Sequence, residues 1–172
     1  MTPPRWILGL ALAVTFAAGG PASAEEKASP EFDRVKVLAG QWEGTARGHG
    51  SPDKGMPTVA TIRVVSAGSA VMLTTDPGTA HEMVTMFHRD DGAMIATHYC
   101  SAMNQPRMKA EPSTDPAKLT FEFVDGTNLK AHPGHMQRLV LNMAGTDRHI
   151  QEWTFNEAGK TNTMVFEMKR KK

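Results

Sequence analysis

His98 and Cys100, separated by one residue, form the most suggestive chemical pair in the sequence. On a β-strand, residues two apart leave the same face, so both side chains could approach one bound molecule. A thiolate and an imidazole bind soft metal ions, and an imidazole can activate a thiol as a nucleophile. Two donors do not complete a site, and a third would come from His81, Met83 or Met108. The favoured alternative is a hydrogen-bonded histidine beside an inert thiol, because free cysteine behaves as a small hydrophobe.

Other patterns that could carry chemistry are weaker. The sequence contains no Gly-x-Ser-x-Gly elbow, Walker loop, Gly-x-Gly-x-x-Gly or His-Glu-x-x-His motif. Glu122 and Glu152 are candidates for a catalytic carboxylate pair, but on strands such residues usually lie on a solvated face. The segment 132–135 (His-Pro-Gly-His) has metal-ligand spacing, but a solvated loop is the favoured interpretation. A binding protein is therefore favoured, and a metal- or thiol-dependent enzyme using His98 and Cys100 is the alternative.

Methionines are frequent in the middle of the chain, at positions 83, 86, 94, 103 and 108. Thioethers bind Cu(I), which raises the possibility of a copper site. Met83 and Met86, however, are three residues apart and point to opposite faces of a strand. Because methionine also fills irregular apolar cavities, a pliable ligand pocket is the preferred interpretation, and neither a metal nor another cofactor is expected.

Length and charge limit the class of protein. The chain has 172 residues, with 19 Lys and Arg against 18 Asp and Glu, and 40% of its residues are hydrophobic. Such a composition is typical of a single globular domain. The balanced charge argues against a nucleic-acid-binding protein, which needs a basic face.

The first 24 residues have the pattern of a signal peptide. Arg5 precedes an apolar stretch from Trp6 to Ala18, and the segment 22–24 (Ala-Ser-Ala) fits a cleavage site. We expect cleavage after Ala24 and a periplasmic or secreted protein with no membrane span after cleavage, because the apolar stretch is short for a bilayer. A flexible leader is expected over 25–33 and the folded domain over 34–172.

Most of the remaining chain consists of short segments with period-two hydrophobicity separated by turn residues such as Asp91-Gly92. One short helical turn, around 32–38, precedes them. The expected strands are 41–48, 58–66, 70–75, 82–88, 93–100, 106–111, 118–124, 136–143, 148–155 and 162–170. This pattern predicts an all-β fold, an antiparallel up-and-down barrel of about nine or ten strands, because closing the sheet removes its edges.

Alternation also predicts which residues face the interior. Three strands have a clear apolar face: Leu119, Phe121 and Phe123; Leu139, Leu141 and Met143; Met164, Phe166 and Met168. The expected strands 82–88 and 93–100 carry apolar residues on both faces. Their inward faces therefore stay undecided at this point.

The segment 38–44 (Leu-Ala-Gly-Gln-Trp-Glu-Gly) resembles the opening Gly-x-Trp motif of lipocalins and other calycins. The resemblance implies that Trp42 plugs one end of the barrel and that a basic residue near the last strand, here Arg170, packs across it. More narrowly, the chain resembles an exported calycin-like bacterial family of unknown function. The stretches that carry this likeness are 81–86 (HEMVTM), 97–100 (THYC), 104–108 (NQPRM), 121–128 (FEFVDGTN) and 151–153 (QEW).

A barrel of this size can enclose one small ligand. The predicted function is therefore the binding of a small, mainly apolar molecule, with no catalysis required. An apolar wall and a few orienting polar groups are typical of such pockets. The candidate ligand-binding residues are His98, Cys100, Gln105, Arg107, Phe121, Phe123, Trp153 and Phe155. Within this set, His98 and Cys100 are expected to meet Arg107 or Gln105 near one end of the cavity, which leaves Tyr99 outside.

Two other functions remain open. Nitrobindin-like ten-stranded barrels also begin with a Gly-x-Trp segment and hold haem through a histidine, which implies His149 as the iron ligand here. His149 would share one face of its strand with Gln151, Trp153 and Phe155. The third possibility is a structural or interaction module with a solid interior.

Overall fold

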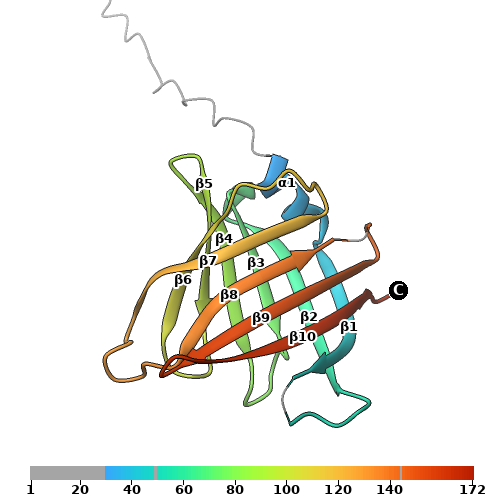
Figure 1. Ribbon diagram of the computed structural model, residues 1–172. Coiled ribbons are helices and arrows are strands. Elements are labelled where there is room, and N and C mark those ends of the chain that lie inside the picture. Colours follow the sequence, from blue (N-terminus) through green and yellow to red (C-terminus); the bar gives the residue numbers. More distant parts are fainter. Residues whose placement is uncertain (1–29, 49, 144) are drawn as a thin grey trace, which may run out of the picture.

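The computed structural model describes residues 30–48, 50–143 and 145–172, and its ten antiparallel strands form a closed barrel (Figure 1). Each strand pairs with the next one in sequence, and β10 closes the barrel against β1. All ten predicted strands are present, so the predicted fold class is confirmed. The elements are α1 (Pro30–Val37), β1 (Gly40–Arg47), β2 (Met56–Val65), a 3₁₀ turn (Ser66–Gly68), β3 (Ala70–Thr75), β4 (Met83–Asp90), β5 (Ala93–Tyr99), β6 (Gln105–Ala110), β7 (Lys118–Thr127), β8 (His135–Asn142), β9 (Arg148–Glu157) and β10 (Lys160–Arg170).

The interior is built from the alternating faces of the strands. Leu119 and Phe121 of β7, Leu139 and Leu141 of β8, and Phe166 and Met168 of β10 are buried, as their periodicity predicts. The structure also decides the two ambiguous strands. In β4 the inward residues are Thr85 and Phe87, and in β5 they are Met94, Ala96 and His98. Tyr99 lies on the outer face, as predicted, with half of its surface exposed.

The helix α1 lies across one end of the barrel (Figure 1). Phe32 and Val35 face inward and are 3% and 1% exposed. Acidic residues occupy the first turn and basic residues the last, which suits the helix dipole. The helix starts at Pro30, so residues 30–33, expected in a flexible leader, belong to the folded domain. These residues are ordered because Phe32, the first residue of the predicted helical turn, is buried against the barrel.

The expected signal peptide, residues 1–24, lies outside the described residues. In the part of the chain that the structure describes, no helix has the length and apolar character needed to cross a membrane.

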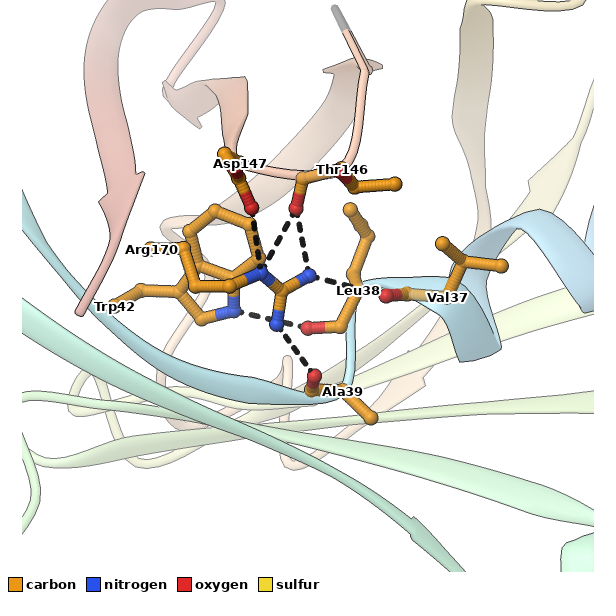
Figure 2. A network of polar contacts seen from close by, with 7 residues as sticks. All are labelled: Val37, Leu38, Ala39, Trp42, Thr146, Asp147 and Arg170. Carbon is orange, nitrogen blue, oxygen red and sulfur yellow. Dashed lines mark hydrogen bonds and ion pairs between the residues drawn. The ribbon is translucent and has the colours of Figure 1, made fainter. Parts of the chain in front are cut away.

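Trp42 and Arg170 close the end of the barrel that α1 covers (Figure 2). The two residues are opposite each other in the register of β1 and β10. Trp42 is 1% exposed, and its indole N–H donates to the carbonyl of Leu38 at 2.9 Å. The guanidinium carbon of Arg170 lies 4.4 Å from the centroid of the indole ring. The contact that the sequence predicted between these two side chains is thus present.

The guanidinium of Arg170 also binds the backbone around the plug. It donates to the carbonyls of Ala39 at 2.7 Å, Val37 at 3.2 Å and Thr146 at 2.6 Å. One side chain therefore joins the α1–β1 junction, the β8–β9 loop and β10. Gly40 makes this approach possible, since a Cβ atom there would lie 2.3 Å from a guanidinium nitrogen and the backbone has a φ of +148°.

We predict that Trp42→Ala lowers the free energy of unfolding by about 3–5 kcal/mol, the usual cost of truncating a large buried aromatic residue. The loss combines a cavity, the indole hydrogen bond and the contact with Arg170. Urea unfolding followed by circular dichroism measures the effect. Arg170→Lys keeps the charge but loses the planar set of donors, and it should destabilise the protein less. An unchanged midpoint for Trp42→Ala would contradict the role of Trp42 as a plug.

Candidate functional site

A cavity of about 650 Å³ opens at the end of the barrel opposite α1. The β1–β2, β3–β4, β5–β6 and β9–β10 connections surround it, because every second connection of an up-and-down barrel lies at the same end (Figure 1). The lining residues are Ala46, Met56, Pro57, Thr58, Asp76, His81, Met83, Cys100, Ser101, Ala102, Met136, Trp153, Phe155, Asn162, Met164 and Phe166. Both ends of the barrel thus differ: one is plugged and the other is hollow.

The wall of the cavity is built from aromatic and thioether side chains. Met164 is the cross-strand partner of Trp153, and Met136 is the partner of Phe155. Such pairs place a flexible sulfur-containing chain beside a rigid ring, a contact that is favourable in itself. Of the predicted ligand-binding residues, the structure places Trp153, Phe155 and Cys100 at this cavity.

Beneath Trp153 the interior becomes polar. The indole N–H of Trp153 donates to the side-chain carbonyl of Gln151 at 3.0 Å, and the amide nitrogen of Gln151 lies 2.9 Å from Nε2 of His149. Because this amide nitrogen can only donate, Nε2 of His149 is the acceptor and the proton of the neutral ring is on Nδ1. The ring of His149 in turn meets that of Trp42, with centroids 4.3 Å apart. A continuous column of side chains therefore runs from the plug to the cavity.

His98 belongs to the same polar layer. It is 3% exposed, its ring lies 4.7 Å from that of Trp153, and its Nδ1 is 2.9 Å from the hydroxyl of Thr85. Its Nε2 atom is buried and has no hydrogen-bond partner in the structure. His98 thus faces the interior, as predicted, but it lies one layer below the lining of the cavity. His98 precedes Cys100 by two residues on the same face of the chain and lies deeper in the barrel.

Burial controls the protonation of both histidines. Desolvation lowers the pKa of His98 to about 4. Desolvation, assisted by the positive charge of Arg170, lowers the pKa of His149 to about 4 as well. Both rings are therefore neutral at pH 7.

Cys100 lies half-buried at the rim of the cavity. Desolvation raises the pKa of its thiol, although hydrogen bonds from the backbone of Ala102 and the side chain of Ser101 act in the opposite direction. The thiol is thus protonated at neutral pH. This state disfavours a role as a nucleophile.

Arg107 does not reach the cavity, and the prediction that it meets His98 and Cys100 there is wrong. The inward residues of β6 are Pro106 and Met108, so Arg107 must point outward. Its Nε atom donates to the carboxylate of Asp125 on β7 at 2.6 Å. Gln105, the other expected partner, accepts a hydrogen bond from the hydroxyl of Thr127 and does not line the cavity.

Phe121 and Phe123 also lie away from the cavity lining. Phe121 is fully buried and packs against Phe87, with ring centroids 5.6 Å apart. Phe123 packs against the ring of His135 at 4.4 Å. The period of the strand predicted the inward face of Phe121 correctly, but the height of a residue along the barrel decides whether it meets the cavity.

Several cavity residues were not among the candidates from sequence, notably Met56, Met136, Asn162 and Met164. A usable signal was present in the predicted topology. In an up-and-down barrel, inward residues next to alternate connections share one end, and these four lie beside the β1–β2, β7–β8 and β9–β10 connections.

Other candidate groups stay on the outside. Glu122 pairs with Arg138 at 2.8 Å, and Glu152 accepts a hydrogen bond from Asn142 at 2.9 Å. Both interactions join neighbouring strands of the barrel. Within the described residues, no three His, Cys, Asp or Glu side chains lie close enough to hold a metal ion together.

Haem ligation through His149 does not fit the residues present. His149 is 1% exposed, its Nε2 accepts a hydrogen bond from Gln151, and its ring contacts the plug residue Trp42. Gln151 and Trp153 separate it from the cavity. An iron ligand at this position would have to displace the polar column.

A solved structure with a similar fold is known. The structure is similar to that of Rv2717c from M. tuberculosis, with a TM-score of 0.60 and 12% sequence identity over 84% of this chain and 99% of that chain. At this identity the likeness supports the barrel fold alone. No family model and no curated protein matches the sequence.

The two buried histidines predict a loss of stability in acid. Their pKa values are near 4 when folded and about 6.5 when unfolded, so the unfolded state binds protons more readily. Above pH 6.5 both states of the protein are unprotonated at these histidines, so protonation does not affect stability. The free energy of unfolding falls as the pH drops from about 6.5 to about 4, by about 3 kcal/mol per histidine.

Urea unfolding at a series of pH values measures this dependence. His98→Gln keeps a hydrogen-bonding group but cannot titrate, so it should reduce the acid-side slope by about half. His88→Gln, on the outer face of β4, is the control and should keep the full slope. A slope that is the same in His98→Gln and in the unmodified protein would contradict the assignment.

Proposed function

We propose that this barrel binds a small, mainly apolar and uncharged molecule in the cavity opposite the plug, without catalysing a reaction. The observation that supports this proposal is the cavity itself. Its volume of about 650 Å³ lies within the usual range for small-molecule sites, and its lining includes four methionines and three aromatic residues.

The charges at the cavity support a neutral ligand. Among the residues that the structure describes, the lining contains no lysine and no arginine that could neutralise an anionic group. Its one carboxylate, that of Asp76, accepts hydrogen bonds from the hydroxyl of Thr58 at 2.8 Å and from the backbone of Val59 at 3.1 Å. These contacts hold Asp76, at the end of β3, against the neighbouring strand β2. A cationic ligand would have to compete with these contacts.

The polar layer under the wall supplies a point of attachment. Among the described residues, Nε2 of His98 is buried without a hydrogen-bond partner, and the ring of His98 lies 4.7 Å from that of Trp153. A buried polar atom without a partner is costly, so a ligand with one hydrogen-bonding group would be favoured if that group reached His98. In this proposal the apolar body of the ligand fills the cavity and its polar end points to the floor.

Export to the periplasm or the medium is part of the proposal. It is supported by the sequence pattern of residues 1–24. An apolar carrier outside the cytoplasm would keep a poorly soluble molecule dispersed. Mass spectrometry of the secreted protein should find Glu25 as its first residue.

The neutral dye Nile red tests the cavity. We predict that Met164→Gln weakens dye binding about tenfold, because it places an amide in the apolar wall beside Trp153. Val165→Gln is the matched control, since the next residue on β10 faces outward and its variant should bind the dye normally. Fluorescence titration gives both dissociation constants. Equal affinities in the two variants would overturn the proposal for this cavity.

Thiol labelling gives an independent test, since Cys100 is the single cysteine. We predict slow alkylation by iodoacetamide in the native protein, a still lower rate with saturating Nile red, and fast alkylation in denaturant. Half-burial at the rim and the raised pKa of the thiol are the physical reasons. A native rate equal to the unfolded rate, and insensitive to the dye, would place Cys100 outside the binding site.

A further inference from the structure

Met83 and Cys100 are placed side by side at the rim of the cavity. Val84 of β4 pairs with Tyr99 of β5, and continuing this antiparallel register by one residue sets Met83 opposite Cys100. Both residues line the cavity, so their side chains share the inward side. Directly opposed residues have Cβ atoms about 5 Å apart, which allows their sulfur atoms to meet.

The side chain of Ser101 provides a second indication that the two sulfur atoms are neighbours. Its hydroxyl oxygen lies 3.7 Å from the sulfur of Met83. The same side chain and the backbone of Ala102 act to lower the pKa of the Cys100 thiol, against the larger effect of desolvation. Hydrogen bonds of this kind orient ligand sulfur atoms and stabilise a thiolate once a metal ion has replaced its proton.

Further soft donor side chains line the same cavity as this pair. Three more methionines, Met56, Met136 and Met164, line the same cavity, and His81 lies at its rim. This set differs from the methionines that are close together in the sequence. Met94 and Met108 are buried in the core, and Met103 is exposed. The barrel topology, and not the local sequence, gathers the sulfur atoms.

We propose that Cys100 and Met83 bind Cu(I) at the rim of the cavity. The chemistry of the donors selects this ion: thiolate and thioether sulfur favour soft monovalent cations, which accept as few as two ligands. The described residues lack a cluster of three His, Cys, Asp or Glu side chains, which zinc would require. Binding replaces the proton of the Cys100 thiol, which is released to solvent, and involves no change in the oxidation state of copper.

The test is an anaerobic titration with Cu(I) in competition with a chromogenic chelator. The protein should retain one Cu(I) per chain. Loss of outer-shell groups alone costs metal sites about 10- to 100-fold in affinity, so loss of a direct ligand in Cys100→Ser should cost about 100-fold or more. Met83→Leu should weaken binding about tenfold. Met86→Leu, three residues along on the outer face of β4, is the matched control and should bind normally.

Far-UV circular dichroism and the urea midpoint show whether the variants are folded, and Cys100→Ser and Met83→Leu should keep both while losing Cu(I). Nile red binding by the unmodified protein separates this proposal from the preceding one. Failure of the unmodified protein to retain Cu(I), or unchanged Cu(I) affinity in either variant, overturns the copper site. Dye binding that fails while Cu(I) is retained overturns the apolar-ligand proposal and leaves this one standing.

Discussion

The contact between Arg170 and Trp42 is the constraint on which the rest of the barrel depends. A closed barrel has no free edges, but its two ends must still be sealed or solvated. Here the first and last strands meet at these two residues, and the guanidinium also binds the backbone of the α1–β1 junction and of the β8–β9 loop. The same side chain therefore fixes strand closure, helix position and the plug.

The polar column under the plug explains why the cavity has a floor. His149, Gln151 and Trp153 follow one another on the inward face of β9, and each is hydrogen-bonded to the next. Apolar contacts are non-directional, whereas hydrogen bonds between these side chains restrict both their distance and their orientation. Trp153 is thus held at a fixed depth in the barrel, with its ring between the polar layer and the cavity.

The sequence predicts the barrel well because its information is local. Period-two alternation and turn residues specify each strand, and the Gly-x-Trp resemblance specifies the plug. The cavity depends on height along the barrel, which alternation does not encode. Phe121 and Trp153 both face inward, yet only Trp153 reaches the cavity. The error at Arg107 has a different source, because it concerns the face of the strand: Pro106 and Met108 occupy the inward face of β6, and Arg107 lies between them.

The two ends of the interior also differ in stiffness, and this difference bears on selectivity. The plugged end is filled by Trp42, His149 and Gln151, each 2% exposed or less and each held by hydrogen bonds or ring contacts. The open end is bounded by Met83, Met136 and Met164, whose unbranched side chains can rearrange around molecules of different shape. A cavity with a rigid floor and pliable walls would select molecules by their length and polarity more than by their shape. Under the proposed function, this arrangement would suit a class of apolar molecules that share one hydrogen-bonding end better than one ligand of fixed shape.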